Sequence, residues 1–189
     1  MQFFARLLAI SGCAAHMAFA HGEGTPPDLR QVQLCVDSSS VRVEFEGMTT
    51  GLQRSAQPRL ERQLRSAFIR ELQRAGVTRI AAVSCAGRDA RVQLLANVRY
   101  LNPKQYQGFG DPAYSYSVHL TVARKQTPGG KSTPRFTAMT SDIHSEAQTR
   151  RKFEIVVAEW GAELAGDLSE AWQKANPKPK APSATPNKP

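Results

Sequence analysis

One amphipathic segment, residues 55–76, constrains the fold more than any other part of the sequence. Its apolar side chains recur at three- and four-residue intervals, which places them on one stripe of a helix. Ser55 can cap the first turn, Pro58 fits that turn, and Gly76 supplies the left-handed residue that ends a helix. Strand-like segments lie on both sides, so the sequence predicts a helix that covers one face of a sheet. The stripe consists of Leu60, Leu64, Ala67, Phe68, Leu72 and Ala75.

Arginines occupy the remaining surface of this helix. Such a face either stays solvated, with its aliphatic stems beside the core, or binds an anion. Arg62 and Arg65 are the candidates for the binding interpretation. The basic positions are Arg59, Arg62, Arg65, Arg70 and Arg74.

Residues 1–20 have the pattern of an export signal. Arg6 makes the start positive, residues 7–15 are an apolar run, and Ala18-Phe19-Ala20 is a small-x-small cleavage site. The apolar run is too short to span a bilayer, so a transmembrane anchor is not expected. The sequence therefore predicts export to the periplasm or cell envelope.

A second interpretation of this signal stays open. The run Ile10-Ser11-Gly12-Cys13 resembles the lipobox of bacterial lipoproteins, in which the cysteine is acylated and becomes the mature N-terminus. That resemblance implies a protein tethered to a membrane, whereas cleavage after Ala20 implies a free one. Cys13 comes very early and the longer apolar run suits Ala20, so we expect cleavage after Ala20.

Cleavage after Ala20 would leave two cysteines, Cys35 and Cys85, in strand-like segments on either side of the helix. An even number of cysteines in an oxidising compartment favours a disulfide, and two buried free thiols are the alternative.

The same cleavage would leave 24 basic and 16 acidic residues, a net charge of +8. This surplus favours anionic partners such as envelope lipids or cell-wall polymers. Nucleic acid would be a partner only if the compartment contains any, and we do not expect it.

Alternation of apolar and polar residues predicts the strands. The first two form either a hairpin or one long bent strand, and the last lies near a sheet edge. The predicted segments are residues 32–37, 41–46, 77–85, 90–101, 113–125 and 135–143.

A second long helix is predicted over residues 146–174, with Ser145 and Gln148 forming a capping box. Gly161 and Gly166 weaken it locally, at a close crossing with the sheet. Its apolar stripe is Phe153, Val156, Val157, Trp160, Leu164, Leu168 and Trp172.

The order of these elements predicts one α+β domain over residues 31–175, after an extended lead-in at 21–30. Its core is a mostly antiparallel sheet of about five strands with two long amphipathic helices packed on one face. Residues 176–189 are rich in proline and lysine and are predicted to be disordered.

This element order is similar to that of small envelope accessory proteins, such as the lipopolysaccharide-assembly lipoprotein and the auxiliary lipoproteins of lipid transporters. The resemblance covers topology and the export signal, with no shared sequence motif. It implies a role in binding, assembly or transport.

The loop at residues 102–112 is the least ordinary connection in the chain. It carries Tyr106 and Phe109, and Tyr100 and Tyr114 lie at the adjoining strand ends. Aromatic side chains on a loop can stack on sugars, bases or peptide side chains. The alternative is that they fold back over the end of the core.

Histidines give a separate hypothesis. Cleavage after Ala20 would make His21 the N-terminal residue, and a terminal His-Gly resembles copper enzymes of the polysaccharide monooxygenase type. That resemblance implies copper held by the terminal amine, His21 and a second histidine, here His119 or His144. Those enzymes are β-sandwiches, whereas this chain has two long helices.

No motif in the sequence predicts a catalytic site. A nucleophile elbow, the HExxH and CxxC zinc spacings and a P-loop are all missing from the sequence. We therefore expect an exported, non-enzymatic envelope protein that binds an envelope protein, polymer or lipid. A secreted, copper-dependent enzyme is the alternative.

Overall fold

The computed structural model describes residues 29–47, 50–85, 88, 90–106, 111–124 and 134–177, with only the backbone given for residues 50–54 and 124. The export signal with Cys13, the N-terminal His21, the loop residue Phe109 and the tail from residue 178 lie outside these residues.

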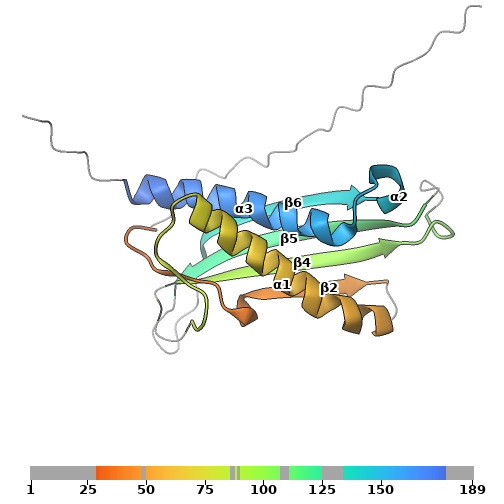
Figure 1. Ribbon diagram of the computed structural model, residues 1–189, viewed down its shortest axis with the longest axis horizontal. Helices are drawn as coiled ribbons and strands as arrows, with labels where there is room; N and C mark the ends of the chain where they lie inside the picture. Colours follow the sequence, from red (N-terminus) through yellow and green to blue (C-terminus); the bar gives the residue numbers. More distant parts are fainter. Residues whose placement is uncertain are drawn as a thin grey trace, which may run out of the picture.

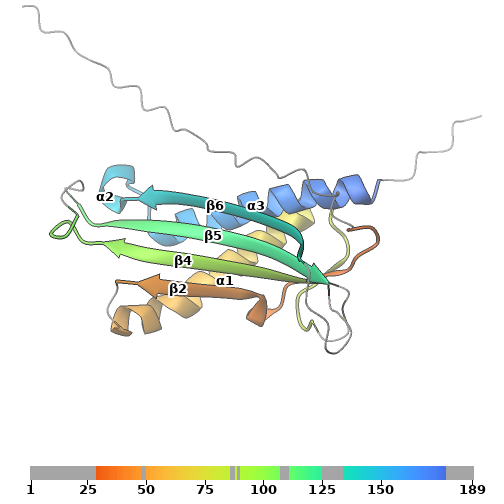
Figure 2. The same cartoon turned by 180° about the vertical axis from the view of Figure 1, so that it is seen from behind.

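The described chain forms a six-stranded sheet with two long helices on one face, which confirms the predicted α+β fold (Figures 1 and 2). The strands lie in the order β3-β1-β4-β5-β6, and β2 also pairs with β4. No helix in this part of the chain is apolar over a stretch long enough to cross a membrane. The elements are β1 Leu34–Cys35, the 3₁₀ turn Ser38–Ser40, β2 Val41–Glu46, α1 Thr50–Arg74, β3 Ile80–Ala81, β4 Ala90–Leu101, β5 Ala113–Arg124, β6 Pro134–His144, α2 Glu146–Thr149 and α3 Phe153–Ala175.

The first two strands run in the same direction along β4, so the hairpin interpretation is wrong. The alternative of one long bent strand is right about the direction, but a 3₁₀ turn divides it into β1 and β2. Leu34 pairs with Ala90, and Val41 pairs with Leu94. The chain therefore advances seven residues from β1 to β2 while β4 advances only four. The 3₁₀ turn takes up the extra residues without reversing the chain. The sheet is therefore mixed: β1 and β2 are parallel to β4, β3 is parallel to β1, and β5 is antiparallel to both β4 and β6.

The first helix begins at Thr50, and the prediction that Ser55 caps it is wrong. Pro58 therefore lies inside the helix and not in its first turn. Its missing N–H leaves one helical hydrogen bond unmade. Gly76 has a φ of +82°, which confirms the predicted left-handed end. Of the predicted strand at 77–85, only the two residues of β3 pair, because β1 offers them a partner of the same length.

The predicted second helix is broken into α2 and α3. Arg150 adopts a left-handed conformation with a φ of 55° and ends α2. Ser145 caps α2 as predicted, since the Gln148 N–H donates to its hydroxyl over 3.4 Å. The Glu146 carboxylate then accepts the Phe153 N–H over 2.9 Å and caps the start of α3.

The core lies between the two helices and the sheet. It contains the whole predicted stripe of α3 and the four large side chains of the α1 stripe, Leu60, Leu64, Phe68 and Leu72. The helices run in the same direction, since Arg59 pairs with Glu154 near their starts (Figure 1). They approach closely at Gly161, where an added Cβ would lie 2.3 Å from the Leu64 Cδ1 atom. Gly161 therefore marks a close crossing with α1, and the predicted crossing with the sheet is wrong; Gly166 has no neighbour within 4 Å of such a Cβ.

Asn176 joins the two ends of the described chain. Its side-chain oxygen accepts the Gln31 N–H over 2.7 Å, and its side-chain nitrogen donates to the Leu29 carbonyl over 2.9 Å. Nearby, the Trp172 indole N–H donates to the Val32 carbonyl over 3.5 Å. The segment before β1 is thereby held against the end of α3.

Candidate functional site

The sheet face opposite the helices is uncovered and carries the polar half of each alternating strand (Figure 2). It contains a hollow of about 510 Å³. Because directly paired residues point to the same face, the register brings side chains from four strands into this hollow. They include Glu44 and Glu46 from β2, Asn97 and Arg99 from β4, Ser115 and Ser117 from β5, and Ser141 from β6.

An ion pair lies in this hollow. The Arg99 Nη2 atom donates to Glu46 Oε1 over 2.7 Å, and both side chains are exposed. The hydrogen bond and charge of Glu46, and to a smaller extent Tyr106, raise the pKa of Arg99 above its usual value. The loop residue Tyr106 is 37 % exposed.

Two other aromatic candidates, Tyr100 and Tyr114, lie on the opposite, helix-covered face. Tyr100 and Tyr114 are neighbours with ring centroids 5.7 Å apart, and Tyr114 stacks on Phe153 of α3 at 4.5 Å. These two rings cover the end of the core. Of the three candidates within the described residues, only Tyr106 is exposed, and binding roles for Tyr106 and Phe109 stay predictions.

The basic surface of α1 is separate from the hollow. Arg59 pairs with Glu154, and Arg74 pairs with Glu71. Arg62 is exposed and Arg65 is half-buried, and within the described residues neither forms an ion pair or a hydrogen bond. Their binding of an anion stays a prediction.

The two described histidines lie on opposite faces of the sheet. His144 is buried on the helix face, where it pairs with Tyr114 and its Nε2 donates to the Arg151 carbonyl over 2.8 Å. His119 lies on the uncovered face. One copper ion cannot therefore contact both, and the copper hypothesis depends on His21 with only one of them.

His119 also lies beside a hydroxyl, with its Nε2 atom 3.2 Å from Ser117 Oγ. A serine hydroxyl and a histidine ring at this distance can serve as a nucleophile and its general base. In the described part of the chain, however, no carboxylate forms a hydrogen bond with His119 to orient it. Within the described residues, the pair thus lacks the third group of a catalytic triad.

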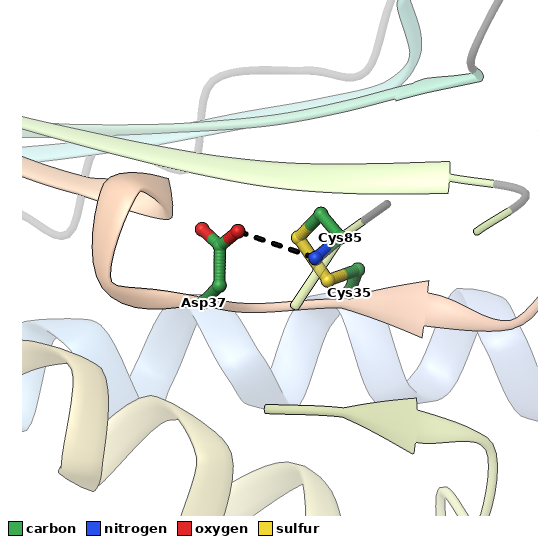
Figure 3. A group of neighbouring side chains, drawn as sticks. All are labelled: Cys35, Asp37 and Cys85. Atoms are coloured by element: carbon green, nitrogen blue, oxygen red, sulfur yellow. Dashed lines mark hydrogen bonds between the residues drawn. A yellow bond between two sulfur atoms is a disulfide. The ribbon is translucent and has the colours of Figure 1, made fainter. Parts of the chain in front are cut away.

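Cys35, Asp37 and Cys85 form a third cluster, at the 3₁₀ turn (Figure 3). The structure contains the Cys35–Cys85 disulfide. The Asp37 carboxylate accepts the Cys85 N–H over 3.3 Å and lies 3.5 Å from the Arg91 guanidinium. Because the two sulfurs are bonded to each other, the cluster offers no thiolate to a metal. Its disulfide and the hydrogen bond to Asp37 hold the turn in place.

Asp37 should make stability depend on pH. Burial by itself raises the pKa of Asp37, but hydrogen bonds from Ser39 and Ser40, the Arg91 charge and the Cys85 N–H together lower it below 3.8. An ionised group with a lowered pKa stabilises the fold at neutral pH, and this contribution is lost as pH falls through the folded-state pKa.

We therefore expect Asp37→Asn to lower the free energy of unfolding by about 1–2 kcal/mol at neutral pH. In urea titrations, the difference from the parent protein should shrink between about pH 5 and pH 2. A difference that stays constant over this range would contradict the role of the charge.

The residues of the hollow were not among the sequence candidates. The signal that could have identified them is the polar half of strands 90–101 and 113–125, where Ser115 and Ser117 alternate with buried residues. Alternation shows that such residues share a face, but only the register with β2 and β6 shows that they surround one hollow.

Comparison with known proteins identifies no family: no family model and no curated protein matches the sequence. Solved structures with a related arrangement include a DUF330 protein from Xanthomonas campestris (16% identity, 78% of this chain, 89% of that one, TM-score 0.46). The PelC dodecamer from Paraburkholderia phytofirmans matches with 11% identity over 77% of this chain and 94% of that one, with a TM-score of 0.46. Rare lipoprotein B from Shewanella oneidensis has 14% identity over 71% and 93%, with a TM-score of 0.32. Similarities this low do not assign a function.

Proposed function

We propose that this chain is an exported, non-enzymatic binding module of the cell envelope, and that the hollow on the uncovered sheet face holds its partner. The observation that carries the proposal is the convergence of polar side chains from β2, β4, β5 and β6 on one hollow. The export signal in the sequence and the Cys35–Cys85 disulfide support an oxidising location outside the cytoplasm.

The lining favours a polar partner with hydrogen-bonding groups. Three serine hydroxyls and the Asn97 amide can each donate and accept, and the Arg99–Glu46 pair offers both charges at one edge. These side chains stand on paired strands, so little ordering is needed when a partner binds. The hollow carries both positive and negative side chains, and this distinguishes it from the basic face of α1.

A blocking substitution tests this proposal. Ser117 lies on β5 within the hollow, and an indole at this position would fill the space that a partner needs. We expect Ser117→Trp to reduce binding of the mature protein to isolated envelope fractions by about tenfold in a co-sedimentation assay. Binding of the parent protein should change little between about 50 and 300 mM NaCl, because the lining is mostly uncharged.

The matched control is the double variant Arg62→Ala/Arg65→Ala, which changes the basic face of α1 and leaves the hollow intact. It should bind as the parent protein does, and thermal unfolding should show that both variants are folded. Loss of binding in the arginine variant, together with steep salt dependence and normal binding by Ser117→Trp, would assign binding to α1 and overturn the proposal.

A further inference from the structure

A smaller pocket lies on the helix side of the sheet, between α3 and the edge strand β6, which are neighbours in both views (Figures 1 and 2). Its volume is about 270 Å³. The proposed binding hollow lies on the other face, so this pocket is a separate feature. The side chains that matter for its chemistry are Tyr116, Trp160, Asp142, Glu159, Glu163 and Arg151.

The charge of this pocket is opposite to that of the whole chain. Three carboxylates and one guanidinium line it, in a protein of net charge +9. Arg151 forms an ion pair with Glu159, so one positive charge is already matched. His144 also lines the pocket, and its Nε2 atom donates to the Arg151 carbonyl. Asp142, Glu159 and Glu163 thus place three carboxylates around the space.

The Tyr116 hydroxyl provides an independent observation. The side chain is only 3 % exposed, and its hydroxyl has no hydrogen-bond partner in the described part of the protein. Burial raises the pKa of Tyr116 most, the Asp142 charge raises it further, and smaller increases come from Glu159 and Glu163. The Trp160 indole lies near enough to lower this pKa slightly, but no hydrogen bond of normal geometry joins the two side chains.

These carboxylates are not gathered as the ligands of a metal ion would be. Within the described residues, the only three metal-ligating side chains whose ligand atoms all lie within 4.8 Å of one another are those of Cys35, Asp37 and Cys85. The carboxylates of the pocket are acceptors that lie apart from one another, so a ligand needs several hydrogen-bond donors to reach more than one of them. Pockets for drug-sized ligands are commonly about 300–1,000 Å³, so this one suits a group the size of a side chain.

We propose that the pocket between α3 and β6 binds an alkylammonium group, which is the end of either a lysine side chain or a small free polyamine. An ammonium group has three donors and no acceptor. It can donate to the Asp142 and Glu163 carboxylates and to the otherwise unpartnered Tyr116 oxygen. The Trp160 ring, beside Tyr116 at 6.0 Å between centroids, offers a face for a cation–π contact.

Fluorescence of Trp160 provides the test. The probes are 1,5-diaminopentane, a short acetylated and amidated peptide with one lysine, and 1,5-pentanediol as the uncharged control. The background variant Trp172→Phe leaves Trp160 as the sole tryptophan of the chain. We expect a saturable change in emission with at least one amine probe and none with the diol. Binding of the peptide alone indicates a partner lysine, and binding of the diamine alone indicates a free amine.

Two residues on the same helix give a matched comparison. Glu163→Gln removes a charge from the pocket, whereas Glu170→Gln removes the same charge two turns further along α3, outside the pocket. We expect Glu163→Gln to weaken amine binding about fivefold and Glu170→Gln to leave it unchanged. Tyr116→Phe should also weaken binding without lowering the thermal midpoint, because the lost hydroxyl has no protein partner. No saturable change with either amine, or equal effects of the two glutamine variants, would overturn the proposal.

Discussion

Removal of the Cys35–Cys85 disulfide is expected to lower the free energy of unfolding by about 4 kcal/mol. The two cysteines are 50 residues apart, and the loop between them contains β2, α1 and β3. In the chain-entropy view, the bond stabilises the fold because it restricts the unfolded chain over this whole length. Urea unfolding of the mature Cys35→Ala/Cys85→Ala variant should show this loss as a lower midpoint.

Alanine is the suitable replacement, because Cys35 is fully buried and a serine there would add a buried hydroxyl. A reducing agent provides the control, since it should shift the parent protein to the same midpoint and leave the alanine variant unchanged. After cleavage at Ala20, no third cysteine remains to react. A variant as stable as the oxidised parent would contradict the loop-closure argument.

Substitution of Gly161 by alanine is expected to lower the free energy of unfolding by about 1–3 kcal/mol. The new Cβ would lie 2.3 Å from Leu64 Cδ1, and Leu64 is fully buried with little room to turn away. The helices would have to separate or Leu64 would have to leave its preferred rotamer. The loss can be measured by urea unfolding, with the slope of the transition compared to confirm that the fold is kept.

Gly166 provides the control on the same helix. An added Cβ there has no neighbour within 4 Å, so Gly166→Ala should stabilise the protein by up to about 1 kcal/mol through helix propensity alone. Combining Gly161→Ala with Leu64→Ala should cost less than the sum of the two single changes, because the smaller side chain makes room. Equal effects of alanine at Gly161 and Gly166 would show that the crossing tolerates a methyl group.

Much of the fold follows from local patterns in the sequence. Strand β4 has the predicted bounds and β5 differs by one residue, because buried and more exposed residues alternate along most of both strands. The buried stripes of α1 and α3 also follow from their spacing. The parallel course of β1 and β2 does not, because a three-residue turn between two strands is compatible with either direction. The break at Arg150 is likewise not evident, since arginine is a good helix former.

The candidate sites depend more on tertiary structure than the fold does. The disulfide could be predicted from the number of cysteines and their places around one helix. The hollow could not, because it needs the register that sets Ser117 opposite both Asn97 and Ser141. The aromatic candidates show the same limit: Tyr100 and Tyr106 are close in sequence, but Tyr100 is half-buried beside Tyr114 and Tyr106 is exposed.

The contacts of Asn176 hold the first and last described segments together at one corner of the domain. Since this one side chain holds both Leu29 and Gln31, the segments that precede and follow the described domain depart from the same corner. A tether on the N-terminal side would therefore hold the domain at that corner and leave the hollow and the α3–β6 pocket free to swing about it. Tension between the two segments would load the Asn176 hydrogen bonds together with the packing of Leu29, which is fully buried in the core.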